Sequence, residues 1–518
     1  MNKYIKLRYT GLLGVSMMAV TGVDQNKINV FSFTGKMKIL HMSWLAFFIS
    51  FMVWFNFAPL MASIRDTFGL SDQEVKLLLI LNVALTIPAR IIIGMLVDKY
   101  GPKITFSVLL ALSSIFCFLF AFAETYEELA TYRFLLGFVG AGFVIGIRLV
   151  SEWFPAKQVG TAEGIYGGWG NFGSAAAAMT LPMLALWIGG DDGWRWAVAS
   201  TGVLALGFSL IFYFSVSNNP KGTTYFRPKN LGAMEVSSKG DFYLYCVMTA
   251  PLYLALVVLA WKISPANLNI FSTTITYSIY SGLLALYVYQ ISQIFRINKA
   301  LFSEKAKPVP EIHRYKFKQV AALNLSYMIT FGSELAVISM LPLFFFDTFK
   351  ATADLSITQA ALIASIFAGL NIIMRPAGGY FSDKYGRKKV LGITLGGLSV
   401  GYFLMGQVDA TWSIPAAIVV MVIASLFVNA GNGAVYAVVP LVKRRLTGQV
   451  AGTTGAFGNV GAVAFLTVLS FVSSQVFFIT IACAAFLVFL LVLFVLEEPK
   501  GYMYEENDDG SIEKIQLH

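Results

Sequence analysis

Charged residues are scarce in this sequence. They make up only 13% of its 518 residues, whereas 57% are hydrophobic, and a soluble globular protein carries about 25% charged residues. The chain therefore lacks the polar surface that three or four soluble domains would need. Its hydrophobic residues form runs such as 104–123 and 475–496, which have the length that a helix needs to cross a bilayer. This composition predicts a polytopic membrane protein.

Cysteine and histidine are also rare, with three residues of each. Cys117, Cys246 and Cys483 all lie in apolar runs without CxxC spacing, which argues against a disulfide framework or a zinc site. No histidine lies in the middle of an apolar run. No GxxxxGK[ST] motif is present, so ATP-driven pumping is not expected. The net charge of +10 is spread over loops, which argues against a nucleic-acid partner. We expect no metal, no cofactor and no enzymatic activity.

The apolar stretches fall into three groups along the chain. Six lie near 42–63, 76–97, 104–123, 130–152, 161–188 and 196–216, and six more near 320–346, 357–380, 389–407, 413–440, 449–472 and 475–496. Two others, 242–261 and 271–294, lie between these sets. The predicted fold is all-α: a six-helix half (42–216), a central linker with an extra apolar helix pair (217–318), a second six-helix half (319–497), and polar ends at 1–41 and 498–518.

The basic residues indicate how the chain is oriented. When alternate loops are assigned to opposite sides, most of the 38 Lys and Arg share one side with both termini. By the positive-inside rule that side is cytoplasmic, and the membrane is the inner (plasma) membrane. The extra pair then crosses twice or not at all. Residues 1–41 are expected to be a cytoplasmic or interfacial segment, because their apolar stretch 11–22 is short for a signal peptide and no small-residue cleavage site follows it.

Two sequence blocks occur twice, in the same order. The block Gly-x-x-x-Asp-Lys-Tyr-Gly stands at 94–101 and, 285 residues later, at 379–386. The block Gly-x-x-Gly-x-Trp/Phe-Gly-Asn-x-Gly stands at 164–173 and, 288 residues later, at 452–461. The chain is therefore expected to consist of two parallel repeats, a plan typical of transporters whose substrate site lies at the bilayer midplane between the halves.

Each half carries one arginine at an equivalent depth. Arg90 stands eight residues before Asp98, and Arg375 stands eight residues before Asp383. Eight helical residues rise about 12 Å, which places both arginines near the middle of a bilayer roughly 30 Å thick. No acid recurs at an equivalent depth in both halves to pair with them. Two converging guanidinium groups, each able to donate two parallel hydrogen bonds, predict a site for an oxyanion.

The glycine-rich blocks have a packing interpretation and a binding interpretation. Small residues three apart allow helices to approach closely. This alone accounts for Gly167, Gly170 and Gly173 and for their counterparts in the repeat, Gly455, Gly458 and Gly461. The amides of Asn171 and Asn459 must find hydrogen-bond partners in an apolar helix. Those partners are either neighbouring backbone atoms or ligand oxygens, and the sequence leaves both possibilities open.

These motifs resemble those of a known family. The loops 94–103 and 379–388 resemble the signature loop of the major facilitator superfamily, and Arg133-x-x-x-Gly137 resembles its fourth-helix motif. Within that superfamily, the glycine blocks 167–173 and 455–461 resemble the paired signatures of the nitrate/nitrite porter family. Residues 143–155 resemble its cyanobacterial nitrate permease branch. The resemblance covers nearly the whole chain.

The resemblance implies which side chains hold the substrate. Members of the family carry nitrate, and often nitrite, between two arginines that correspond to the pair described above. Tyr327-x-x-x-Phe331 matches the family's seventh-helix motif, which implies that Tyr327 donates a hydrogen bond to the anion and that Phe331 packs against it. Phe143 corresponds to the opposing aromatic ring, and Asn171 corresponds to an amide that contacts substrate.

Glu334 departs from one branch of the family. It lies one heptad after Tyr327, near mid-membrane and on roughly the same helix face. The proton-coupled members resemble this sequence here, whereas the corresponding part of the bacterial nitrate/nitrite exchangers is apolar. A buried carboxylate can carry a proton, but it can equally serve as a fixed counter-ion to one of the arginines. Both roles remain open.

The remaining polar residues are assigned to gating or structure. Arg148 and Glu152 are four residues apart near the cytoplasmic end of the fourth span, which favours a local salt bridge or an inner gate. Glu163, at the start of the fifth span, is expected at the membrane interface. Arg133 and the two loop aspartates, Asp98 and Asp383, are expected to be structural or gate residues.

The sequence thus predicts a monomeric secondary transporter whose partners are nitrate, nitrite, protons and the lipid bilayer. Proton-coupled nitrate uptake is expected. The alternatives are a nitrate/nitrite exchanger, an antiporter of another oxyanion such as an organic phosphate, and a nitrate sensor. A flat anion suits the two aromatic rings better than a tetrahedral phosphate does. The polar segments 217–241, 295–318 and 498–518 are too short to form a signalling domain.

Overall fold

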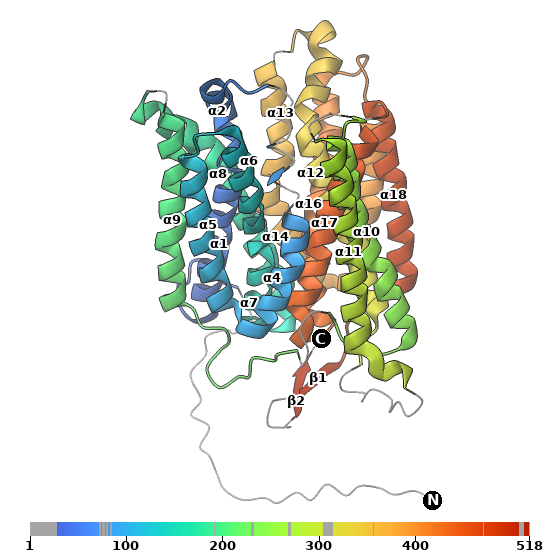
Figure 1. Cartoon of the computed structure of the whole chain (residues 1–518). Coiled ribbons are helices and arrows are strands. Elements are labelled where there is room, and N and C mark those ends of the chain that lie inside the picture. Colours follow the sequence, from blue (N-terminus) through green and yellow to red (C-terminus); the bar gives the residue numbers. More distant parts are fainter. Residues whose placement is uncertain are drawn as a thin grey trace, which may run out of the picture.

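The computed structural model describes residues 28–71, 74, 78, 81–82, 85–190, 192–228, 233–267, 271–303, 314–355, 357–469, 471–506 and 512–516. These residues form an elongated bundle of helices with a two-stranded antiparallel hairpin at one end, β1 (Tyr502–Glu506) and β2 (Ile512–Gln516) (Figure 1). The predicted all-α fold is confirmed. Of the expected interfacial segment 1–41, residues 1–27, with the apolar stretch 11–22, lie outside the described residues.

Among its described residues, the first half contains eight α-helices and two 3₁₀ turns. They are α1 (Gly35–Phe55), η1 (Ala58–Leu60), α2 (Met61–Phe68), α4 (Thr86–Tyr100), α5 (Pro102–Ala121), α6 (Tyr126–Leu136), η2 (Gly137–Ala141), α7 (Gly142–Trp153), α8 (Ala156–Ile188) and α9 (Gly193–Ser215). α1 begins seven residues before the expected start of the first span. The fourth span is divided by η2, because the backbone at Gly137 and Gly140 packs directly against Asn82 and Trp54.

The second half repeats this order. Its elements are α12 (Phe317–Ala353), α13 (Ile357–Gly369), α14 (Asn371–Tyr385), α15 (Arg387–Met405), α16 (Ile414–Tyr436), η5 (Val439–Leu441), η6 (Arg444–Leu446), α17 (Thr447–Leu469) and α18 (Ser474–Val495). The two copies of the loop motif end their helices in the same way. α4 ends at Gly101 with φ 85°, and α14 ends at Gly386 with φ 101°, a backbone conformation that favours glycine.

The helix pairings follow the internal repeat. Within the halves, α1 packs against α8 as α12 packs against α17, and α5 packs against α9 as α15 packs against α18. Between the halves, α4 packs against α17 and α14 packs against α8. Each arginine-bearing helix therefore lies against the glycine-rich helix of the opposite half.

The extra pair consists of α10 (Lys239–Ile263) and α11 (Thr273–Asn298), followed by η3 (Lys299–Phe302). α10 packs against α12 and α17, and α11 packs against α10. In Figure 1 both helices run alongside the second half. α11 buries Thr276, Ile294 and Asn298 and exposes apolar residues such as Leu284 and Val288.

Ten helices in the described part of the chain are long and apolar enough to cross a membrane. The prediction of a multi-pass membrane protein is confirmed. α4 and α14 are not among the ten, because each has 15 residues and carries an arginine, an aspartate and a lysine. They still lie inside the bundle, paired with the glycine-rich helices described above.

The contact between α14 and α8 predicts the effect of adding one methyl group. A Cβ at Gly379 would overlap the backbone carbonyl of Gly160, so Gly379→Ala should lower the free energy of unfolding by about 1–3 kcal/mol through overpacking. Gly207→Ala is the matched control, because nothing lies within 4 Å of a Cβ at that α9 position. Thermal unfolding of the purified protein in detergent measures both variants. Equal unfolding temperatures would contradict the close approach of α14 and α8.

Candidate functional site

Two buried arginines occupy equivalent positions on α4 and α14. Arg90 and Arg375 are each 1% exposed. Arg90 Nη1 donates to the carbonyl of Gly455 at 2.6 Å, and its Nε donates to the carbonyl of Gly140 at 3.4 Å. Arg375 Nη2 donates to Tyr327 Oη at 3.1 Å. In the described part of the chain, neither guanidinium forms an ion pair, and Arg375 Nη1 has no hydrogen-bond partner.

Two phenylalanine rings lie against both arginines. The Phe143 ring centroid is 5.9 Å from Arg90 Cζ and 5.0 Å from Arg375 Cζ. The Phe331 ring centroid is 5.4 Å from Arg90 Cζ and 6.0 Å from Arg375 Cζ. The structure therefore brings two cations and two aromatic faces into one cluster, although the four residues come from four separate helices, α4, α7, α12 and α14. Cation–π attraction partly offsets the cost of burying the charges.

Tyrosines complete this cluster. Tyr327 stacks on Phe331 with ring centroids 4.9 Å apart and an interplanar angle of 5°. Tyr436 of α16 packs edge-on against both Tyr327, at 4.8 Å, and Phe143, at 4.6 Å. Tyr166 of α8 stacks against Phe143 at 5.8 Å. Tyr166 and Tyr436 were not predicted from the sequence; the available signal was that Tyr166 directly precedes Gly167 in a repeated block.

The glycine blocks make room for the arginines and the rings. A Cβ at Gly167 would lie 2.6 Å from Arg375 Nε, and one at Gly455 would lie 3.1 Å from Arg90 Cδ. A Cβ at Gly458 would meet the rings of Phe331 and Tyr327. Gly170, Gly173 and Gly461 meet Phe47, the Phe48 carbonyl and the Met328 carbonyl respectively, so they allow close packing of the helices within each half. The blocks thus serve both the binding cluster and the packing within each half.

The two repeated asparagines differ in their surroundings. Asn459 is fully buried on α17, and neither its Oδ1 nor its Nδ2 has a partner among the described residues. Asn171 lies on α8, four residues after Gly167, and is only half-buried. A buried polar group requires a hydrogen-bond partner. Of the two asparagines, Asn459 is therefore the one whose buried amide is available to bind a ligand oxygen.

Glu334 is held by two amide side chains. It lies on α12 and is 3% exposed. Its Oε1 accepts a hydrogen bond from Asn371 Nδ2 at 2.6 Å, and its Oε2 accepts one from Asn432 Nδ2. Asn371 precedes Arg375 by one turn of α14, so the carboxylate belongs to the neighbourhood of the second arginine. The sequence analysis did not find either asparagine, because their roles depend on how three helices meet.

The halves are joined by hydrogen bonds at the end of the bundle that carries Lys99, Lys384 and the β-hairpin, here called the basic end. Asp98 accepts from the backbone N–H groups of Gly448 and Gln449, both at 2.9 Å. Asp383 accepts from the backbone N–H of Gly160 at 3.0 Å and of Thr161 at 2.6 Å. Both aspartates therefore bind the first turns of the opposite half's glycine-rich helix.

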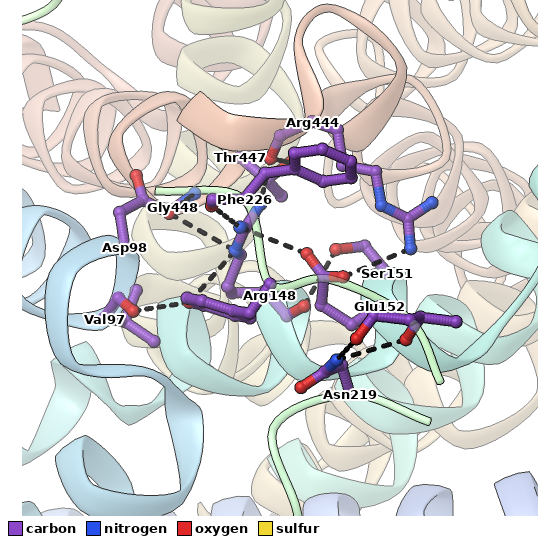
Figure 2. A network of polar contacts seen from close by, with 12 residues as sticks. Val97, Asp98, Arg148, Ser151, Glu152, Asn219, Phe226, Arg444, Thr447 and Gly448 are labelled. Carbon is purple, nitrogen blue, oxygen red and sulfur yellow. Dashed lines mark hydrogen bonds and ion pairs between the residues drawn. The ribbon is translucent and has the colours of Figure 1, made fainter. Parts of the chain in front are cut away.

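Arg148 lies at the centre of a polar network at the basic end (Figure 2). It forms ion pairs with Glu152 at 3.1 Å and with Asp98 at 3.4 Å, and all three side chains are at most 2% exposed. Its guanidinium also donates to the carbonyls of Arg444 and Phe226. Arg444 in turn pairs with Glu152 at 3.4 Å. Arg148 thus connects the first half, the linker and the second half.

Arg133 and Glu163 lie elsewhere. Arg133 is fully buried in the first half, where it donates to Asn56 Oδ1 and Asn82 Oδ1 at 3.2 Å and to the carbonyl of Trp54. It therefore stabilises the packing of α6. Glu163 is 1% exposed, because α8 begins at Ala156 and its first turns are covered by α14 and α16; its position at the membrane interface stays a prediction.

The part of the chain that the structure describes contains no cluster of metal-ligating side chains. No group of three or more His, Cys, Asp or Glu residues lies close enough there to hold a metal ion. The chemistry available at the central cluster is anion binding: positive charge, donors and flat apolar faces.

A family model described as the Major Facilitator Superfamily matches residues 43–308 and 323–512. The chain therefore belongs to this superfamily of transporters, and it is not an enzyme. The crystal structure of the human organic anion transporter MFSD10 (TETRAN) has the same fold, with a TM-score of 0.62 and 12% sequence identity over 89% of this chain and 100% of that chain.

Two cyanobacterial relatives narrow the classification. The nitrate/nitrite transporter NrtP of Picosynechococcus sp. is 44% identical over 93% of this chain and 97% of the relative. The nitrate/nitrite transporter NrtP of Nostoc punctiforme is 41% identical over 91% of this chain and 94% of the relative. Within the superfamily, this chain is a member of the nitrate/nitrite porter family.

The network at the basic end predicts a large effect on stability. Arg148→Ala leaves Asp98 and Glu152 buried without their shared cation, so the free energy of unfolding should fall by about 3–5 kcal/mol. The matched control is Arg65→Ala, because the pair of Arg65 with Asp66 is solvent-exposed and is expected to contribute at most about 1 kcal/mol. Thermal unfolding in detergent compares them. A variant Arg148→Ala as stable as Arg65→Ala would show that the network does not hold the halves together.

Proposed function

We propose that this protein imports nitrate, with nitrite as a second substrate, by alternating access coupled to protons. The observation that carries the proposal is the cluster of Arg90, Arg375, Phe143 and Phe331 between the halves, with Arg375 Nη1 unpartnered among the described residues. Two unpaired guanidinium groups in an apolar bundle require an anion to neutralise them. The relatives named nitrate/nitrite transporter support the choice of anion.

The shape of the cluster favours a small flat anion. Phe143 and Phe331 present ring faces to the space beside both arginines, and the Tyr327 hydroxyl is already bonded to Arg375. A planar oxyanion can lie against a ring face while its oxygens accept hydrogen bonds from the guanidinium edges. A tetrahedral organic phosphate gains less from these flat surfaces. The buried amide of Asn459 supplies a further donor.

The negative charge of nitrate favours coupling of its uptake to protons. Moving one nitrate into a cell that is negative inside opposes about 2.3 kcal/mol per 100 mV, so a net importer must carry positive charge with it. Glu334 is the candidate proton carrier. It is buried in the helix that carries Tyr327 and Phe331, and it is linked through Asn371 to the helix that carries Arg375.

Nitrate/nitrite exchange is the second candidate, and one observation favours it. Each carboxylate oxygen of Glu334 accepts an N–H from an asparagine, a pattern that suits an ionised carboxylate acting as a fixed counter-ion. Exchange of one anion for another moves no net charge and needs no proton. The two candidates differ in the pH dependence of uptake.

We assign the basic end to the cytoplasm, with both termini on that side, because lysines and arginines gather in its loops.

The halves are 42–216 and 319–497, and 217–318 links them. α10 is among the ten helices that are long and apolar enough to cross a membrane, whereas α11 is not. The 26 residues of α11 are still long enough to cross the bilayer, so we assign two crossings to the extra pair. The substrate cluster lies within one chain, so a monomer suffices. The conformation described is closed at the cytoplasmic side.

The arginine pair gives a first prediction about transport. Arg90→Lys and Arg375→Lys should each raise the nitrate concentration needed for half-maximal uptake by about 10- to 100-fold, because lysine cannot make the paired charge-assisted hydrogen bonds. Uptake of labelled nitrate into liposomes measures this. Arg65→Lys, which changes an exposed arginine, is the control. Normal half-saturation in both site variants would refute the central anion site.

Glu334 gives a second prediction about transport. Glu334→Gln should abolish nitrate uptake driven by a pH gradient while retaining exchange of external for trapped internal nitrate, because the amide cannot carry a proton. Glu497→Gln is the control: hydrogen bonds from Lys316 and Lys318 lower the pKa of Glu497 below its usual value, so it stays ionised in the assay. If Glu334→Gln still takes up nitrate in response to the pH gradient, Glu334 is a fixed counter-ion.

A further inference from the structure

Glu163 is a buried acid to which the central site assigns no role. It lies on α8, one turn after the residues that bind Asp383, and it is 1% exposed. Neither Oε1 nor Oε2 has a hydrogen-bond partner within the described part of the chain, and the side chain forms no ion pair there. An ionised carboxylate in such surroundings is strongly destabilised. In this conformation the geometry therefore suits a carboxylic acid that holds its proton.

The internal repeat shows that packing alone does not require an acid here. With the offset of 288 residues between the glycine blocks, the counterpart of Glu163 is Ala451 on α17. Ala451 is also fully buried, and the glycines on either side of the two residues occupy matching positions. An alanine thus fills this position in one half, whereas the other half places a carboxyl group in it. A transporter that needs a second proton has a reason for this asymmetry.

Four titratable groups surround Glu163. Toward the basic end, Asp383 of α14 and Arg387 of α15 act on it electrostatically. Toward the central cluster, Tyr166 of α8 and Tyr436 of α16 are within the range of its charge. Both tyrosine hydroxyls already donate to backbone carbonyls. Among the described residues, α1, α7 and α9, which also pack against α8, present no charged group that acts on Glu163.

Arg387 offers a partner for the ionised form. Its Nη2 donates to the Ala156 carbonyl and to Asp383, and its Nε donates to the Ala437 carbonyl at 3.1 Å. Its Nη1 is buried and has no partner among the residues described. A carboxyl group without a donor and a guanidinium N–H without an acceptor therefore occupy the same neighbourhood. Loss of the proton from Glu163 would give each of them a partner.

We infer that Glu163 is a second proton-carrying residue of the transport cycle, placed between the anion cluster and the cytoplasmic end. The inference rests on the proposed proton-coupled nitrate uptake. In the loaded carrier Glu163 is protonated. When the cytoplasmic side opens, its O–H bond breaks, the proton passes to cytoplasmic water, and the carboxylate pairs with Arg387. Together with the proton on Glu334, this brings in two protons per nitrate and one net positive charge.

The charge count makes the inference testable by separating voltage from pH. With two protons, an inside-negative potential of 100 mV alone can sustain about 50-fold nitrate accumulation in liposomes. With one proton, transport is electroneutral and the potential alone sustains none. Glu163→Gln mimics the protonated acid permanently, so this variant should still accumulate nitrate under an inside-alkaline pH gradient clamped at zero potential. It should lose accumulation driven by a potassium diffusion potential at equal pH.

Two controls accompany this experiment. Glu497→Gln, which removes an exposed carboxylate, should respond to both driving forces like the parent protein. Exchange of external labelled nitrate for trapped nitrate tests whether the Glu163→Gln variant folds and alternates, because exchange needs no net proton movement. Glu163→Asp, which keeps an ionisable group, should restore part of the voltage response.

The possible outcomes are distinct. Voltage-driven accumulation by Glu163→Gln equal to that of the parent overturns the inference. Loss of nitrate exchange in Glu163→Gln also overturns it, because the carboxyl group would then be needed for the conformational change itself. If the parent protein responds to neither pH nor voltage, the proposed proton coupling is wrong and the inference fails with it. That failure is visible in the parent before any variant is compared.

Discussion

The burial of two positive charges at the centre of an apolar bundle is the constraint on which the rest of this structure depends. An arginine near the bilayer centre costs at least about 2.5–3.5 kcal/mol, and the sequence predicts that depth for both arginines. The surrounding residues reduce that cost without forming an ion pair with either guanidinium in the part of the chain that the structure describes. Gly455 presents a backbone carbonyl to Arg90, Tyr327 presents a hydroxyl to Arg375, and two phenylalanine rings lie against both. The carbonyl and hydroxyl dipoles and the aromatic rings offset part of the cost of burying the two arginines without adding negative charge. A bound anion would supply that charge.

The same constraint explains why each arginine lies against a glycine of the opposite half. A side chain at position 167 or 455 would occupy the space of a guanidinium. The contact of α4 with α17 and of α14 with α8 therefore brings both cations to the line where the halves meet. At the basic end, Asp98 and Asp383 bind the first turns of those same glycine-rich helices. One pair of helix contacts thus serves the anion cluster and the closure between the halves.

The halves share a framework but differ in the polar groups they add to it. The first half contributes Arg148 and Glu152, whose counterparts in the repeat are Gly433 and Ala437. The second half contributes Glu334 and its two asparagines. Glu163 stands opposite Ala451. Arg148 and Glu152 belong to the ion-pair network at the basic end, whereas Glu334 and Glu163 are the carboxyl groups that the proposed proton coupling would use.

The internal repeat allowed the all-α membrane fold and the equivalent positions of Arg90 and Arg375, which lie on α4 and α14, to be predicted from sequence. Helix boundaries were less accurate. α1 begins earlier than expected, and η2 divides the fourth span at glycines that accommodate Trp54 and Asn82. Hydropathy could not show these features, because they depend on which side chain lies opposite a given backbone.

The sequence by itself determined the membrane fold, the duplication and the chemical type of the central site, because periodicity, charge and repeated motifs are local properties of the chain. Tertiary structure alone decided the partners. It placed Tyr436 and Tyr166 against the predicted phenylalanines, joined Asn371 and Asn432 to Glu334, and buried Glu163 within the electrostatic range of Arg387. Residues this far apart in sequence meet only because helices from both halves pack together, and hydrogen-bond partners are set by that packing.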